Sequence, residues 1–282
     1  MSNREKRTLG FIKLIIGCFF FLSVILPLAK LLMNFGQADI AKILAMPTVG
    51  HAFVNSIASS LTATLISVTL AMAAACCMAR TAIRGKKFFH TLLLFPMLIP
   101  SLSHGMSLII LFGSNGALTR FFNISQGIYG FWGIVTGSVM YSFPIAYLML
   151  LDILRYEDAA PYEAASVLGI PPHRKLFAIT LPYLRKPLIN VLFATFTLCV
   201  TDYGVSLMVG GTYKTLPLLM YEEVIGRQDF AQGSVFGVIL LAPAIVAFVV
   251  DMFCQNRTNS TFQSKPFTPR KSRIGNALSY IF

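Results

Sequence analysis

The sequence predicts an all-α membrane protein with about six transmembrane helices. Its 282 residues are 56% hydrophobic and only 12% charged, whereas a soluble domain carries about 25% charged residues. The apolar residues also gather into runs close to the roughly 20 residues that are needed to cross a bilayer core. None of these runs shows the alternation of apolar and polar residues that is typical of barrel strands.

Six apolar segments are predicted to be helical spans, because a backbone in lipid must satisfy its own hydrogen bonds. They cover approximately residues 11–33, 54–79, 88–112, 129–154, 188–209 and 234–255. The first segment follows a basic start, Arg4, Lys6 and Arg7, as a signal peptide would. Its apolar stretch exceeds a signal-peptide core of about 7–15 residues and no A-x-A cleavage site follows, so we expect a retained span.

The third predicted span contains residues that interrupt a helix: Pro96, Pro100, Ser101, Ser103 and His104. Proline removes a backbone hydrogen bond, and serine hydroxyls can satisfy the groups that are freed. Two interpretations stay open. One is a packed kink, which we favour, and the other is a broken helix that lines a translocation pathway with Ser103 and His104.

The distribution of Lys and Arg predicts the orientation of the chain in the membrane. Eighteen of the 23 lie in the N-terminus, in the loops after the second and fourth spans, and in the C-terminal tail. This bias predicts that both termini and the loop 155–187 are cytoplasmic. The net charge of +12 does not indicate nucleic acid binding, because the basic residues sit in short clusters between apolar runs.

Residue patterns for chemistry or metal binding are absent. The five cysteines all lie in or beside apolar runs and form no CxxC pair, so we expect buried hydrophobes rather than ligands. His104 has no second His or carboxylate at ligand spacing, which argues against a metal site. The chain lacks G-x4-G-K-[ST], HExxH and a nucleophile elbow. We therefore expect a non-enzymatic chain that binds no cofactor and does not hydrolyse ATP.

The loop between the fourth and fifth spans predicts a compact elbow outside the bilayer. Pro161 suits the first turn of a helix, and Glu163 in that turn favours its positive end. Gly169 is expected to end this helix, since two prolines follow it directly. A second short helical stretch over about 173–180 is expected to stop at Pro182.

The residues of this elbow carry a resemblance to a known family. Their spacing matches the signature E-A-A-x3-G-x9-I-x-L-P of ABC importer permeases at every defined position, which are Glu163, Ala164, Ala165, Gly169, Ile179, Leu181 and Pro182. The resemblance implies that the loop forms a coupling helix that fits a cleft on a cytoplasmic ATPase. Glu163 then resembles the acidic residue of that contact, and Gly169 resembles the turn. An ordinary amphipathic loop helix is the alternative.

The wider resemblance covers about residues 50–255 and is to the MetI-like permease fold, a five-helix core. Residues 1–49 then supply one N-terminal helix and a first periplasmic loop, and 256–282 a cytoplasmic tail or linker. The chain looks most like the iron(III), phosphonate, polyamine and thiamine branch. The residues that carry this likeness are Phe95-Pro96, Pro100, Asn115-Gly116-Ala117-Leu118 and Asp202-Tyr203-Gly204. Some members of this branch are double-length, and the apolar turn at 274–282 fits either half of such a chain or a tail.

The resemblance also implies partners. They are a cytoplasmic ABC ATPase dimer that binds ATP–Mg, a second permease core in a homo- or heterodimer, a periplasmic solute-binding protein and the lipid of a bacterial inner membrane. It implies as candidate solutes 2-aminoethylphosphonate or another phosphonate, iron(III), a polyamine and thiamine. An ion-coupled secondary transporter is a rival, although we find no paired internal repeats.

Asp202 is the only acidic residue deep in a predicted span, and a carboxylate there usually faces a cavity or a partner. One interpretation is that Asp202 and Tyr203 line the translocation path or its gate. The other is a structural hydrogen bond, or a position nearer to the outer interface. An intramembrane enzyme is a second rival, but Asp202 has no evident catalytic partner in the sequence.

Overall fold

The computed structural model describes residues 3–82, 84–122 and 127–255, and these parts contain helices and no β-strand. Five helices are long and apolar enough to cross a membrane, and a bent helix pair makes a sixth span if its two halves are taken together. The predicted all-α membrane fold with about six spans is therefore confirmed. The predicted tail and its apolar turn at 274–282 lie outside the described residues.

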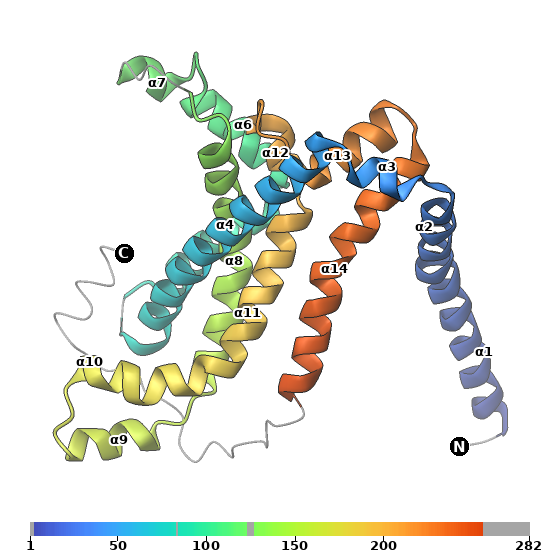
Figure 1. The fold of residues 1–282 in the computed structure, drawn as a ribbon. Helices are drawn as coiled ribbons and strands as arrows, with labels where there is room; N and C mark the ends of the chain where they lie inside the picture. Colours follow the sequence, from blue (N-terminus) through green and yellow to red (C-terminus); the bar gives the residue numbers. More distant parts are fainter. Residues whose placement is uncertain (1–2, 83, 123–126, 256–282) are drawn as a thin grey trace.

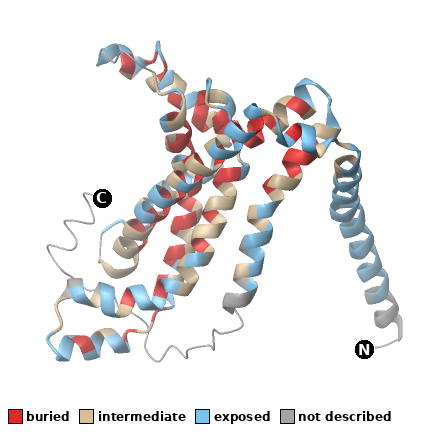
Figure 2. Ribbon diagram, in the orientation of Figure 1, coloured by how far each residue is buried: buried red, intermediate tan, exposed pale blue. Residues whose placement is uncertain are grey.

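The N-terminal arm is a long helix that stands apart from the rest of the molecule (Figure 1). It comprises α1 (Asn3–Phe20), a π-helical turn (Phe21–Ile25) and α2 (Leu26–Gln37). Residues 10–30 of the arm are all exposed, as the pale blue of Figure 2 shows. The arm packs on the bundle where α2 meets α14 (Phe230–Gln255).

The centre of the bundle is built on α4 (Pro47–Arg80), α8 (Phe131–Arg155) and α11 (Leu181–Thr201). Small side chains allow α4 and α8 to approach closely, and Ser67 of α4 accepts a hydrogen bond of 3.0 Å from Ser142 of α8. Tyr147, Leu150 and Val191 are completely buried among them. This packing holds the lower ends of the three helices in fixed positions relative to one another.

The third predicted span is broken rather than kinked within one continuous helix. It consists of α5 (Lys86–Leu94), a 3-10 turn (Phe95–Leu98), α6 (Ser101–Phe112) and α7 (Ala117–Phe121). The halves Lys86–Leu98 and Ser101–Phe121 are bent by 99°. The break falls at Ile99 and Pro100, and the Pro100 carbonyl accepts from the backbone N–H of Ser103 at 2.9 Å. The predicted interruption is confirmed. It is a break between two helices, whereas we favoured a packed kink within one helix.

The fifth predicted span differs from the structure at both ends. It was expected at 188–209, but the span runs over Phe177–Thr201 and a separate short helix, α12 (Gly204–Val209), follows. The Asp202 carboxylate accepts a hydrogen bond of 3.0 Å from the backbone N–H of Val205. That bond satisfies a donor in the first turn of α12, so the backbone starts a new helix here.

The described termini and the elbow lie at one end of the bundle (Figure 1). This end carries the start of α1, the helices α9 (Ala160–Val167) and α10 (Pro172–Lys175), and the end of α14. The opposite end carries α3 (Ile40–Leu44), α7, α12, α13 (Leu216–Tyr221) and the π-helical turn Glu222–Gly226. The grouping agrees with the predicted distribution of Lys and Arg between two sides.

Candidate functional site: a docking elbow

The elbow begins where the sequence predicts a helix start. The Asp158 carboxylate accepts from the backbone N–H of Ala160 at 3.1 Å, directly before α9. Pro161 and Glu163 both lie in the first turn of α9, as expected. A carboxylate in this position favours the partial positive charge of a helix N-terminus.

Gly169 ends the first arm of the elbow in a left-handed turn with φ of +70°. The N–H of Gly169 donates to Ser166 at 3.1 Å, and the N–H of Ile170 donates to Ala165 at 2.9 Å. These two bonds are those of a Schellman motif, which closes a helix at its C-terminus. No atom lies within 4 Å of the position a Cβ would take, so the backbone angle is the reason for glycine.

The second arm of the elbow does not stop at Pro182, which corrects the sequence prediction. Helix α10 continues through a π-helical turn, Leu176–Thr180, directly into α11. Pro182 is the second residue of α11, and the helical backbone passes from the π-helical turn through it without a break. The elbow is therefore joined to a membrane span without an intervening loop.

The two arms are tied together by side chains. Lys175 donates a hydrogen bond of 2.6 Å to the Ser166 hydroxyl, which in turn donates to the Tyr162 carbonyl at 2.8 Å. Of the remaining signature residues, Ile179 is partly buried, while Leu181 and Pro182 are exposed beside them. All seven signature residues thus lie at the same end of the molecule.

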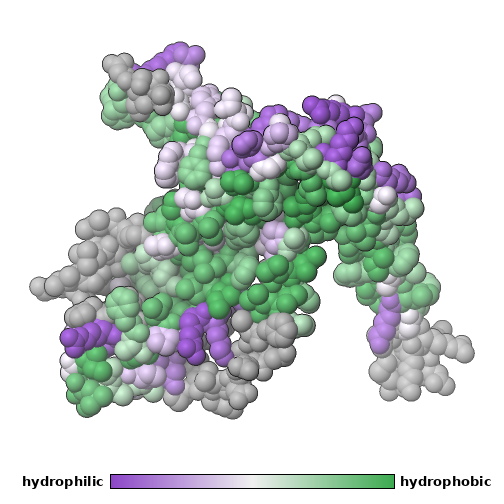
Figure 3. Space-filling model, viewed as in Figure 1, coloured by the Kyte–Doolittle hydropathy of each residue, from purple (hydrophilic) through white to green (hydrophobic). Residues whose placement is uncertain are grey.

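The tip of the elbow is apolar and exposed. Val167 is 88% exposed and Leu168 is 76% exposed, whereas Ala165 is 4% exposed on the inner side of α9. Glu163 and Ala164 are also exposed. Figure 3 shows the apolar tip at the lower left, next to hydrophilic atoms of the same end. Large apolar side chains in such a position are typical of a protein–protein contact.

A buried polar cluster joins the base of the elbow to α4, and we call it the hub. Arg80 Nη2 lies 2.7 Å from Glu157 Oε2 and donates to the Tyr162 hydroxyl at 2.8 Å. The Tyr162 hydroxyl donates to the other oxygen of Glu157, and Thr180 Oγ1 lies 2.6 Å from it. Glu157 is 3% exposed and Thr180 is 1% exposed.

The environment of the hub keeps the Tyr162 phenol protonated. Burial raises the pKa of Tyr162 far above its usual range, and the hydrogen bond to Glu157 raises it further. Sequence reasoning missed this cluster, because Arg80 stands 77 residues before Glu157. The only local signal in the sequence was the acidic character of Glu157, which lies shortly before the signature.

The tentative pathway residues belong to a second place, where α6 packs on α12. A Cβ on Gly204 would lie 2.9 Å from the backbone nitrogen of Leu102, so α12 packs on α6 through a glycine. Ser103 and His104 lie on α6, and Asp202 and Tyr203 directly precede α12, so all four belong to the two helices that meet here.

The contacts that these residues make are mostly ones that stabilise the fold. The His104 ring is 2% exposed, and its Nδ1 lies 3.2 Å from the Pro100 carbonyl. The Tyr203 ring stacks on Tyr221 with centroids 4.8 Å apart. Asp202 was expected deep in a span, but it lies between α11 and α12 and caps α12. The hydrogen-bonding interpretation of Asp202 thus has an observed partner.

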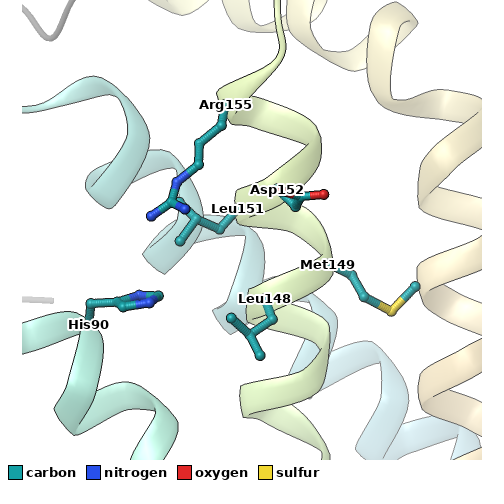
Figure 4. A pocket seen from close by; sticks show the side chains of 6 residues that line it. All are labelled: His90, Leu148, Met149, Leu151, Asp152 and Arg155. Carbon is teal, nitrogen blue, oxygen red and sulfur yellow. The ribbon is translucent and has the colours of Figure 1, made fainter.

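A cavity of about 350 Å³ lies beside the lower part of α8 and is lined by His90, Leu148, Met149, Leu151, Asp152 and Arg155. Figure 4 shows Arg155 on the side of His90, whereas Asp152 points away from both. No predicted site residue lines this cavity. In the described part of the chain, no group of three or more His, Cys, Asp or Glu residues is arranged to hold a metal ion.

Comparison with known families gives one match over most of the bundle. The family described as "Binding-protein-dependent transport system inner membrane component" matches residues 67–256. These residues include the elbow, the hub and both broken helices.

Curated relatives are similar at low identity. A ferric transport system permease protein, FbpB, of Actinobacillus pleuropneumoniae is 23% identical over 99% of this chain and 43% of its own length. A spermidine/putrescine transport system permease protein PotC homolog of Mycoplasma genitalium is 26% identical over 68% of this chain and 65% of the relative. The molybdenum transport system permease protein ModB of Azotobacter vinelandii is 28% identical over 61% of this chain and 80% of its own length. The chain spans less than half the length of the ferric relatives.

Solved structures share the fold. A chain of a bacterial alginate ABC transporter, solved with an alginate-bound periplasmic protein, superimposes with a TM-score of 0.69 at 16% identity. The match covers 93% of this chain and 97% of the other. A second structure of an alginate importer gives a TM-score of 0.71 at 13% identity.

Proposed function

The chain belongs to the family of binding-protein-dependent transport system inner membrane components, and on that premise we propose that it is the transmembrane permease subunit of an ATP-driven ABC importer. It moves a small solute across a bacterial inner membrane and leaves ATP hydrolysis to a separate subunit. The observation that carries this proposal is the exposed apolar tip of an elbow that is built into a membrane span.

The elbow is the docking element for a cytoplasmic ABC ATPase dimer that binds ATP–Mg. Val167 and Leu168 enter the cleft of the ATPase, and the exposed Ala164 lets its backbone approach closely. Glu163 supplies the acidic group at the edge of this contact. The Schellman turn at Gly169 and the Lys175–Ser166 bond hold the tip in one shape, which lowers the entropy lost on docking.

The end that bears the elbow faces the cytoplasm. The basic residues of the chain concentrate at the segments of this end, and positively charged loops stay on the cytoplasmic side of a membrane. Both termini are then cytoplasmic, and α3, α7, α12 and α13 face the periplasm. A solute-binding protein delivers its cargo to that outer end.

A second permease core completes the membrane unit. Residues 10–30 of the N-terminal arm are exposed within this chain, and the arm packs on the bundle where α2 meets α14. An apolar helix in this position reaches across to the second core, whether that core is a copy of this chain or a different one. The region where α6 meets α12, with Ser103, His104, Asp202 and Tyr203, lies along the path that the two cores enclose.

The solute belongs to the group carried by the relatives of the chain. Their printed names include ferric iron, polyamines, thiamine, molybdenum and sulfate. Iron(III), a polyamine and thiamine are therefore the first solutes to test, together with 2-aminoethylphosphonate and other phosphonates.

Reconstitution tests the proposal. The chain is co-expressed with the ABC ATPases of its source organism, and the complex is isolated through a tag on the chain. We expect one ATPase to co-isolate and to support uptake that requires Mg-ATP. Uptake in ATP-depleted vesicles that follows an ion gradient would contradict the proposal and support a secondary transporter.

A further inference from the structure

The cavity beside α8 lies between two helices near the end of the bundle that bears the elbow. His90 of α5 lines one side, and Leu148 and Arg155 of α8 line the other (Figure 4). Leu148 and Arg155 are seven residues apart, so the lining extends about 10 Å along α8. The cavity therefore has a cationic end at Arg155 and an apolar end at Leu148.

The cationic end carries a charge that no acidic side chain neutralises. In the part of the chain that the structure describes, the Arg155 guanidinium forms no ion pair and no hydrogen bond. Lys86, the first residue of α5, lies close enough to Arg155 for the two positive charges to repel each other. The Asp152 side chain points away from Arg155 (Figure 4). A bound anion would relieve the repulsion between the two basic residues.

His90 offers a second donor to the cavity. Its Nδ1 lies 2.9 Å from the hydroxyl of Tyr147, which is completely buried, and this contact holds the imidazole ring in place. When the hydroxyl donates to Nδ1, neutral His90 carries its proton on Nε2 and can donate it to a ligand. Figure 4 shows the ring extending toward α8 on the side of Arg155, so both donors can reach one anion.

The other end of the cavity is apolar. Leu148 and Met149 lie about two helical turns before Arg155 on α8, away from the end that bears the elbow. Helix α5 also presents exposed apolar side chains, with Phe88 67% and Leu92 55% exposed. A free inorganic anion gains nothing from such side chains, whereas a hydrocarbon chain attached to the anion would bury apolar surface against them.

We infer that this cavity binds one anionic phospholipid of the cytoplasmic leaflet, with the phosphate between Arg155 and His90 and an acyl chain against Leu148. Basic pockets between transmembrane helices on the cytoplasmic side of a membrane bind anionic lipid headgroups. The inference rests on the proposed function only in taking the end that bears the elbow as cytoplasmic. A second copy of this chain fits the cavity less well, because the segments at this end carry most of its Lys and Arg.

Lipid binding to the purified full chain tests the inference. The chain is stripped of lipid in detergent and titrated with phosphatidylglycerol or phosphatidylcholine, and native mass spectrometry counts the bound molecules. We expect one phosphatidylglycerol to bind, and phosphatidylcholine, whose headgroup has no net charge, to bind more weakly. Equal binding of the two lipids would overturn the inference.

Matched variants locate the lipid. Arg155→Gln should bind phosphatidylglycerol about tenfold more weakly, because it removes a charge-assisted hydrogen bond. Arg185→Gln is the control, since Arg185 is an exposed arginine in the first turns of α11 that does not line the cavity. Leu148→Trp fills the apolar end without changing the charge and should also weaken binding. Parental affinity in both Arg155→Gln and Leu148→Trp would overturn the inference.

Two further measurements separate the lipid from other occupants. An excess of inorganic phosphate should leave phosphatidylglycerol bound, and displacement of the lipid would overturn the inference in favour of a site for a free anion. In inverted membrane vesicles that contain the assembled transporter, phosphatidylglycerol with a photoreactive acyl chain should label a peptide that includes residues 148–155. The absence of this adduct would overturn the inference, because another protein then covers the cavity.

The lipid measurement on the purified chain requires neither an ATPase nor a solute. A chain that prefers phosphatidylglycerol but assembles with no ATPase would contradict the proposed function and support the lipid site. A chain that imports its solute with an ATPase but binds both lipids equally would contradict the lipid site alone.

Discussion

Arg80 and Glu157 form an ion pair of 2.7 Å that connects the end of α4 to the residue where the elbow leaves α8. The Glu157 side chain is 4% exposed and that of Arg80 is 20% exposed, so water screens the pair weakly. The pair therefore fixes the base of the elbow to the membrane bundle, and the elbow projects from a rigid platform.

Removing the charge of Glu157 should destabilise the protein. Glu157→Gln leaves the Arg80 guanidinium partly buried without its counter-ion, which costs about 1–3 kcal/mol. The measurement is the thermal unfolding of the purified chain in detergent. Glu222→Gln is the matched control, because its partner Lys214 is 48% exposed and such a pair contributes about 0–1 kcal/mol. Equal melting temperatures for the two variants would show that the Arg80–Glu157 pair contributes no more than a surface pair.

The turn at Gly169 should be sensitive to any side chain. Gly169→Ala forces an L-residue into a left-handed conformation, which costs about 1–2 kcal/mol. We expect faster proteolysis at the elbow and less ATPase co-isolated with the chain. Gly50→Ala is the control, since Gly50 is helical and nothing lies within 4 Å of the added methyl group. A Gly169→Ala chain that co-isolates as much ATPase as Gly50→Ala would contradict the assigned role of the turn.

The apolar tip should supply much of the docking affinity. Leu168→Ser removes an exposed apolar side chain without disturbing the fold, and a residue at the centre of an interface contributes more than about 1 kcal/mol. That free energy corresponds to a roughly fivefold weaker association with the ATPase. Titration of ATPase onto immobilised permease measures it. Tyr156→Ser, on a residue exposed at the same end, should bind as the parent does, and equal affinity for both variants would place the contact elsewhere.

Two substitutions of Asp202 distinguish its two interpretations. Asparagine keeps an oxygen that accepts from Val205, whereas alanine removes a cap that contributes about 0.5–2 kcal/mol. If Asp202 acts as a cap, Asp202→Asn should transport normally and Asp202→Ala should be less stable to heat. If the carboxylate charge lines the path, both variants should lose uptake, whatever their melting temperatures.

The packing of α6 on α12 should tolerate no added methyl group. Gly204→Ala would bring a Cβ to 2.9 Å from the Leu102 nitrogen, and overpacking of this kind costs about 1–3 kcal/mol. Thermal unfolding in detergent should show the loss. Gly226→Ala, where nothing lies within 4 Å, should leave the melting temperature unchanged. A stable Gly204→Ala chain would mean that the two broken helices separate easily.

The sequence was sufficient where a local rule decided the outcome. Apolar runs predicted the spans, because lipid leaves the backbone no other choice than a helix. Gly169 predicted the end of α9, since few other residues adopt a positive φ. The interruption of the third span also followed from its prolines and serines, although the 99° bend did not.

The predictions from the sequence were wrong or incomplete where a hydrogen bond or a contact between distant residues determines the structure. The apolar run of the sequence continues past Thr201. The carboxylate of Asp202, however, accepts a hydrogen bond from the N–H of Val205, and the span ends before it. Pro182 was predicted to stop the second helical stretch, but the helix continues through it into α11. The hub was not predictable, because its four side chains come from separate segments and meet only in the folded chain.

Crosslinking at the elbow tip tests the central claim most directly. A photoreactive amino acid is introduced at Val167 in inverted inner-membrane vesicles that contain the co-expressed ATPase. The account predicts a covalent adduct between the permease and the ATPase from this position, and none from Phe122, an exposed residue at the opposite end. An adduct from Phe122 and none from Val167 would contradict it.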